Sequence, residues 1–138
     1  MLLKKEYIFI FVLILTPVLP ALFLSPSVKI EPQKNDKDPF RKTMEELIGE
    51  NILWVDARSR EKYEARHVPG AVLINSINWD SGLDRLFGVF EPGQTVVVYC
   101  NKGCSESKSV SARLRVALGQ ENVFYLEGGI DAWFLKNQ

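Results

Sequence analysis

Two cysteines, Cys100 and Cys104, have the greatest capacity for covalent chemistry in this chain. Cys100 directly follows residues 95–99, an apolar and mostly β-branched run that predicts a buried strand, and a helix is expected soon after it. Backbone N–H groups of the intervening loop and of the helix N-terminus can then face the Cys100 sulfur and favour its thiolate. The position predicts a nucleophilic cysteine, with a small buried apolar residue as the alternative.

The residues around Cys100 define a candidate active-site loop. Lys102 adds a positive charge, and Gly103 permits tight backbone curvature. Cys104 can resolve an oxidised Cys100, form a fixed structural bridge with it, or remain an inert thiol; a bridge requires Cα atoms within about 7 Å. The other residues assigned to the loop are Asn101, Ser105, Glu106 and Ser107.

Alternating strands and helices are expected to position this loop. Four short apolar runs predict strands at residues 52–55, 72–74, 95–99 and 123–126. Helices are predicted at a capping box in residues 43–46, at 59–65, at 79–87, after the cysteine loop up to Gly119, and at 130–136. This order is typical of an α/β domain with a parallel sheet and helices on both faces. Ligands then bind beyond the carboxyl ends of the strands, where Asp56 and Cys100 fall.

Two of these helices have a predicted buried face. The short helix after the capping box is expected to bury Met44, Leu47 and Ile48. The helix after the loop is expected to bury Val110, Leu114, Ala117 and Leu118.

Three motifs in register resemble the rhodanese-like domain family. They are Asp56-Ala-Arg58 with Tyr63-Glu-Ala-Arg-His-Val-Pro-Gly-Ala71, then the Tyr99-Cys100 loop, then Leu126-Glu-Gly-Gly-Ile-Asp-Ala-Trp133. The resemblance covers about residues 40 to 136 and implies a rhodanese α/β fold with Cys100 at the centre of a cradle-shaped loop. In active members that cysteine takes up sulfane sulfur as a persulfide and passes it to cyanide or a thiol. Paired loop cysteines resemble a subset of the family.

The loop departs from the family pattern at its end. Many sulfurtransferases of this fold carry Arg near the end of a six-residue loop, whereas Ser105 or Glu106 stands there in this chain. Ser107 is expected to cap the next helix in an arrangement one residue longer than usual. Loss of the Arg fork and the charge of Glu106 argue against phosphatase activity and against efficient use of thiosulfate.

The remaining motif residues are expected to support the fold. His67, the sole histidine, lies in a turn and is predicted to be a structural hydrogen-bonding group rather than a base. Asp56 and Arg58 brace the loop, pair with each other, or cap a helix. Glu127-Gly-Gly129 is predicted to turn into the last helix, where Trp133 packs.

Composition limits the classes of partner. The chain has 138 residues, with 17 Lys plus Arg balancing 17 Asp plus Glu, so it lacks the basic field that nucleic-acid binding requires. Two cysteines and one histidine do not make a structural zinc set, and we expect neither metal nor cofactor. We expect a monomer that acts on a small sulfur donor or a protein thiol.

An uncharged stretch at residues 7–24 follows Lys4 and Lys5 and predicts a membrane-targeting segment. Its 18 residues are barely long enough to span a bilayer core. The lack of an Ala-x-Ala site fits an anchor, whereas the short apolar core and the small Ser25 and Ser27 fit a cleaved signal peptide. We assign residues 1–27 to this segment, 28–39 to a tether and 40–138 to the domain, which is expected outside the cytoplasm.

Two functions follow from these features. The first is a membrane-tethered or exported sulfur-transfer enzyme that uses Cys100. The second is a thiol redox or binding module that uses the Cys100/Cys104 pair without turnover. Labelling of Cys100 by sulfane sulfur distinguishes the two.

Overall fold

A five-stranded parallel sheet forms the centre of residues 37–138, the part of the chain that this computed structural model describes. The predicted membrane segment and the tether up to residue 36 lie outside the described residues. Among the helices of residues 37–138, none has the length and apolar character needed to cross a bilayer.

The sheet has the strand order β1-β5-β4-β2-β3. β4 is central and pairs with β2 from Ile52↔Thr95 to Asp56↔Tyr99, so the two strands end side by side. The predicted parallel sheet is confirmed, and one short edge strand, β1, was not predicted. The strands are β1 (Arg41–Lys42), β2 (Ile52–Asp56), β3 (Val72–Leu73), β4 (Thr95–Tyr99) and β5 (Val123–Leu126).

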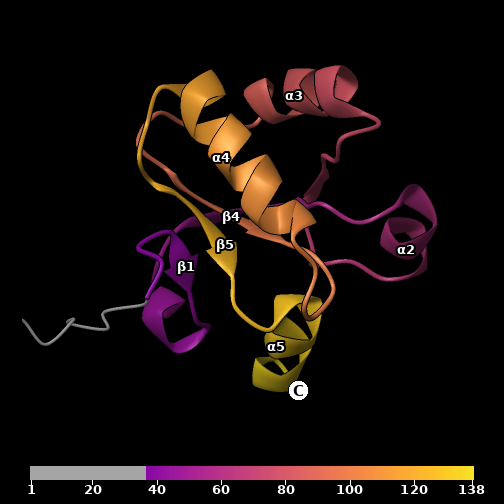
Figure 1. The fold of residues 1–138 in the computed structure, drawn as a ribbon, viewed down its shortest axis with the longest axis vertical. Coiled ribbons are helices and arrows are strands. Elements are labelled where there is room, and N and C mark those ends of the chain that lie inside the picture. Colours follow the sequence, from indigo (N-terminus) through magenta and orange to yellow (C-terminus); the bar gives the residue numbers. More distant parts are fainter. Residues whose placement is uncertain (1–36) are drawn as a thin grey trace, which may run out of the picture. The chain divides into compact units, whose positions relative to one another are not determined.

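Helices cover both faces of the sheet, as predicted. They are the 3-10 helix η1 (Glu45–Leu47) and the α-helices α2 (Arg60–Ala65), α3 (Trp79–Phe87), α4 (Glu106–Leu118) and α5 (Gly129–Lys136). Figure 1 shows α3 and α4 on one side of the strands and α5 on the other. Because side chains alternate along a strand, Val96 and Val98 of β4 pack under α3 and α4, whereas Val97 and Tyr99 pack toward η1 and α5.

Two predicted buried positions are exposed. The capping box at Thr43 and Glu46 forms, but η1 is a single turn and the chain becomes extended at Ile48, which is 69% exposed. On α4 the buried face follows Ser107, Val110, Ser111 and Leu114, which leaves Ala117 on the exposed flank. The short turn at η1 and the nearby end of α4 therefore correct the expectations for Ile48 and Ala117.

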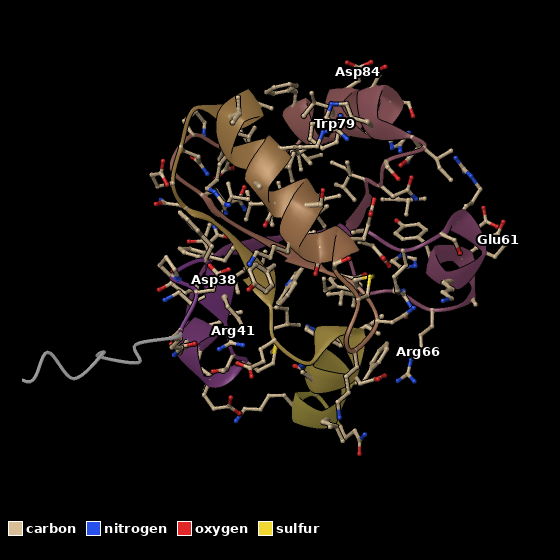
Figure 2. All side chains as sticks on the ribbon, in the orientation of Figure 1. Asp38, Arg41, Glu61, Arg66, Trp79 and Asp84 are labelled. Atoms are coloured by element: carbon tan, nitrogen blue, oxygen red, sulfur yellow. A yellow bond between two sulfur atoms is a disulfide. The ribbon has the colours of Figure 1, made fainter. Side chains whose placement is uncertain are left out.

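Asp38 links the chain before β1 to β5 and α4 (Figure 2). Its carboxylate accepts hydrogen bonds from the Tyr125 hydroxyl at 3.1 Å and the Phe40 N–H at 3.1 Å, and it pairs with Lys108 Nζ at 2.7 Å. The Lys108 hydrogen bond is the largest cause that lowers the pKa of Asp38 to about 2. Asp38 falls in the predicted tether, yet it contacts both β5 and α4.

We predict that Asp38→Asn lowers stability in a pH-dependent way. A carboxyl whose folded pKa is about 2 and whose ordinary value is 3.8 stabilises the fold above about pH 4 and ceases to do so as the pH falls through 2. The loss at pH 7 should be below about 1 kcal/mol, because Lys108 is exposed. Urea unfolding of the full chain from pH 7 to pH 2 should show the difference shrinking with acid.

Asp84→Asn is the matched control, since Asp84 is an exposed α3 residue outside these contacts. A difference between the wild type and Asp38→Asn that stays constant down to pH 2 would contradict the assigned ion pair.

Candidate functional site

The candidate active-site loop joins the central strand to the longest helix. Cys100 follows the last residue of β4 and is 4% exposed, and α4 begins at Glu106 with Ser105 as its N-cap residue. The loop therefore has six residues, 100 to 105. The expectation that Ser107 caps a longer arrangement is wrong. The first helical hydrogen bond runs from the Ser109 N–H to the Ser105 carbonyl, so Ser107 lies buried in the first turn.

The two cysteines form a disulfide within this loop, with Cα atoms 6.0 Å apart. The loop curls because the Cys104 N–H donates to the Asn101 carbonyl at 3.1 Å and Gly103 has a φ of +78°. Gly103 thus supplies the predicted curvature, while Lys102 is exposed to solvent. Neither thiol is free, so the reading of Cys104 as an inert thiol does not describe this state of the protein.

The start of α5 supports the loop from below. The Ile130 N–H donates to the Cys100 carbonyl at 2.8 Å. Gly129 has a φ of +63°, and a Cβ there would meet the Cys100 carbonyl oxygen and lie 2.7 Å from the Asn101 carbonyl carbon. The predicted turn at Glu127-Gly-Gly129 is confirmed, and it also fixes the backbone of Cys100.

A buried polar cluster holds the strand ends beside the loop. The Asp56 carboxylate, fully buried, accepts from Arg58 Nη2 at 2.7 Å, from Arg58 Nε at 3.0 Å and from the Tyr99 hydroxyl at 2.8 Å. Of the three roles considered for Asp56 and Arg58, mutual pairing is observed, and through Tyr99 the pair also braces the start of the loop. Burial raises the pKa of Tyr99. Burial by itself lowers the pKa of Arg58, but the hydrogen bonds and charge of Asp56, together with Tyr99, outweigh it and raise that pKa.

The same cluster also binds the backbone of the segment between α2 and β3. The Tyr99 hydroxyl accepts from the Val68 N–H at 3.1 Å, and Arg58 Nη2 donates to the Arg66 carbonyl at 2.6 Å. His67 Nδ1 lies 2.7 Å from the Tyr63 carbonyl, and its ring stacks on that of Tyr63 with centroids 3.9 Å apart. The structural role predicted for His67 is confirmed.

Glu106 reaches away from the loop. Its Oε1 accepts from the Ser76 N–H at 3.0 Å, which links the first turn of α4 to the segment before α3. The carboxylate is therefore engaged by the backbone rather than directed into solvent.

A cavity of about 340 Å³ opens on the Cys104 side of the loop. Its lining combines loop residues with β1, α4 and the turn before α5, namely Arg41, Asn101, Gly103, Cys104, Ser105, Ser107, Lys108, Tyr125, Leu126, Glu127, Gly128 and Gly129. Residues 37–138 hold no group of three His, Cys, Asp or Glu side chains placed to bind a metal ion.

Sequence reasoning missed Tyr99 and Arg41. Tyr99 is assigned from the sequence to a strand and to the family motif with no role for its hydroxyl, although a phenol in an otherwise aliphatic run needs a buried partner. Arg41 belongs to a two-residue strand with no distinctive pattern, so no local signal marked it.

We predict that Gly129→Ala destabilises the domain more than Gly119→Ala. Both glycines have a φ of +63°, but an added Cβ at Gly119 meets nothing within 4 Å. Backbone strain of about 1–2 kcal/mol is common to both, and the clash with the Cys100–Asn101 backbone is an additional cost for Gly129 alone. Equal losses in thermal or urea unfolding would show that α5 does not brace the loop.

We predict that Tyr99→Phe costs about 1–3 kcal/mol, because it leaves one buried oxygen of Asp56 and the Val68 N–H without the hydroxyl. Tyr125→Phe, which removes a hydroxyl bound to the partly exposed Asp38, is the control and should cost less. Urea unfolding measures both, and a smaller loss for Tyr99→Phe would argue against the cluster as the main support of the site.

Comparison with known proteins agrees with the motifs. A family model described as the rhodanese-like domain matches residues 40–136. The thiosulfate sulfurtransferase GlpE of Pseudoalteromonas translucida is 29% identical over 91 residues, which cover 66% of this chain and 81% of that protein.

Two solved structures are similar to part of this chain. A protein from Bacillus halodurans is 25% identical with a TM-score of 0.56 and covers 71% of this chain and 73% of its own. A rhodanese-like domain protein from Staphylococcus aureus is 22% identical with a TM-score of 0.48, covering 67% and 89% of the two chains. With its family match spanning most of its length, this chain belongs to the rhodanese-like domain family.

Proposed function

We propose that this domain is a sulfurtransferase that carries sulfane sulfur on Cys100. The observation that carries the proposal is the position of Cys100. It lies at the carboxyl end of the central strand and begins the six-residue loop that leads to the N-terminus of α4. That end of a parallel sheet is where α/β proteins bind ligands, and the helix N-terminus favours a thiolate. The name of the GlpE relative, a thiosulfate sulfurtransferase, supports the same reaction class.

The reaction has two displacement steps at sulfur. In the first, the Cys100 thiolate attacks the outer sulfur of the donor; the new S–S bond makes a persulfide, and the rest of the donor leaves with the bonding electron pair. In the second, an acceptor thiolate or cyanide attacks the terminal persulfide sulfur, and Cys100 departs as a thiolate. No net oxidation of the protein occurs.

The Cys100–Cys104 disulfide is the inactive oxidised form in this scheme. A sulfur atom already bonded to Cys104 has no thiolate to attack a donor. Reduction must therefore precede the first turnover, and Cys104 acts as the thiol that protects or resolves Cys100.

The donor is proposed to be a small sulfur compound or a protein thiol carrying sulfane sulfur. The loop has no Arg, and Glu106 contributes a negative charge at the start of α4, so a dianion such as thiosulfate should be a poorer donor than a monoanionic persulfide. The hydrogen bond of Glu106 to the Ser76 N–H fixes that charge at the first turn of α4.

The domain is proposed to act as a monomer outside the cytoplasm, anchored to a membrane by residues 1–27 or exported after their removal. The uncharged run behind Lys4 and Lys5 supports this location. Fractionation of cells expressing the tagged full chain, with carbonate extraction of membranes, separates an anchored from a released protein; recovery in the cytosol would refute both.

We predict that Cys100→Ser abolishes labelling by sulfane sulfur, whereas Cys104→Ser retains it. Each full-chain protein is reduced, freed of reductant, and treated in parallel with thiosulfate and with a low-molecular-weight persulfide. Mass spectrometry of tryptic peptides then locates the added sulfur atom, because cleavage after Lys102 places the two cysteines on different peptides.

Labelling of Cys104 in the Cys100→Ser protein at the wild-type rate would show that the nucleophile is misassigned. A wild-type protein that cycles between dithiol and disulfide yet takes no sulfur from either donor would instead be the thiol redox or binding module.

A further inference from the structure

The cavity beside the loop is lined by one cysteine of the disulfide and not by the other. Cys104 lines it, while Cys100 is absent from its wall and only 4% exposed. Its volume of about 340 Å³ lies at the lower end of the range for small-molecule sites. A small nucleophile that enters this cavity therefore meets Cys104 before Cys100.

The wall of the cavity carries two cations and one carboxylate. Lys108 is held by Asp38 at 2.7 Å, so part of its charge is already neutralised. Arg41 Nε is buried and has no hydrogen-bond partner among residues 37–138, and its nearest acid, Glu127, lies 3.7 Å away. Arg41 thus retains a buried donor beside Cys104, on a side chain that is 36% exposed.

We propose that this cavity binds a small thiol bearing a carboxylate, with Arg41 holding the carboxylate while the thiolate attacks Cys104. The guanidinium matches a carboxylate in geometry and charge, and the disulfide supplies the electrophile that a thiolate needs. The inference rests on the proposed function, because it names the reductant that releases Cys100 for sulfur transfer.

The exchange balances in two steps. The thiolate sulfur forms a bond to Cys104 Sγ, the Cys100–Cys104 bond breaks, and Cys100 leaves with the electron pair as a thiolate. A second thiolate then attacks the small-molecule sulfur of the mixed disulfide and releases Cys104. Two molecules of thiol are oxidised to one disulfide, and the protein disulfide is reduced to two thiolates.

The choice of Cys104 as the attacked sulfur has a further consequence. Attack on Cys104 releases Cys100 before the first turn of α4, where a thiolate is favoured, so Cys100 is the better leaving group. Attack in the opposite sense would require entry to a sulfur atom that is almost fully buried.

The test measures reduction of the full-chain disulfide by 3-mercaptopropionate and, separately, by neutral 2-mercaptoethanol. For each reagent, the reduction rate of the variant is divided by that of the wild type, so the intrinsic reactivities of the two thiols cancel. Arg41→Gln should slow reduction by 3-mercaptopropionate about threefold to tenfold at low salt. The rate of reduction by 2-mercaptoethanol should stay within about twofold of the wild-type rate. High salt should shrink the first effect.

Two further variants fix the interpretation. Glu127→Gln removes the carboxylate that competes for Arg41, and it should accelerate 3-mercaptopropionate alone. Lys62→Gln, an exposed change on α2 outside the cavity, should affect neither reagent. Equal effects of Arg41→Gln on both reagents, or an unchanged rate for the acid in Glu127→Gln, would overturn the proposal.

Acid quenching and alkylation during reduction should trap the mixed disulfide on the peptide that contains Cys104. Adducts on Cys100 would overturn the assignment of the attacked sulfur. These rates and adducts do not depend on sulfur transfer: a protein that takes no sulfane sulfur can still give the expected pattern, and an active sulfurtransferase can fail it.

Discussion

The Asp56 carboxylate is fully buried, and the arrangement of the strand ends depends on how its charge is satisfied. Desolvating a carboxylate costs several kcal/mol unless partners replace the lost water. Arg58 supplies a forked ion pair and a backbone N–H, and Tyr99 supplies a hydroxyl. Because Asp56 ends β2 and Tyr99 ends β4, this one charge locks the two neighbouring strand ends in register. Tyr99 immediately precedes Cys100, so the cluster also determines where the loop begins.

Beyond Tyr99, the contacts between the loop and the rest of the domain are made largely by backbone atoms. The Cys100 carbonyl accepts from the Ile130 N–H, and the close approach of Gly129 permits this contact. On the other side the Glu106 carboxylate ties the start of α4 to Ser76. Such supports keep the loop curved with few specific side chains, which is consistent with a family loop that tolerates Ser105 in place of Arg. The chemistry of the loop then depends mainly on the groups that surround it.

The sequence predicted the strands and helices well where hydrophobic pattern and turn residues agreed. The β4 run and the helix at residues 79–87 coincide with the observed bounds because tertiary packing reinforces both patterns. The predictions that Ile48 and Ala117 are buried were wrong because each residue lies at a helix end, where one residue of difference decides which way a side chain points. The sequence does not predict β1, because two residues carry no period. It does not select the pairing of Asp56 with Arg58 among their three possible roles, because that choice depends on burial. Sequence spacing also does not fix the distance between Cα atoms, so the disulfide cannot be predicted from the sequence alone.

The two cysteines differ in access, and this difference sets an order of events. Cys100 is almost fully buried, whereas Cys104 lines a cavity that also contains Arg41. If reduction enters through Cys104 and sulfur loading then takes place on the released Cys100, the two reactions use different sulfur atoms of the loop in a fixed order. The cation for the first then comes from edge strand β1, outside the loop that in many relatives carries Arg. In the proposed scheme the loop has no anion-binding Arg beside Cys100, and Arg41 provides one beside Cys104, the cysteine that is attacked during reduction.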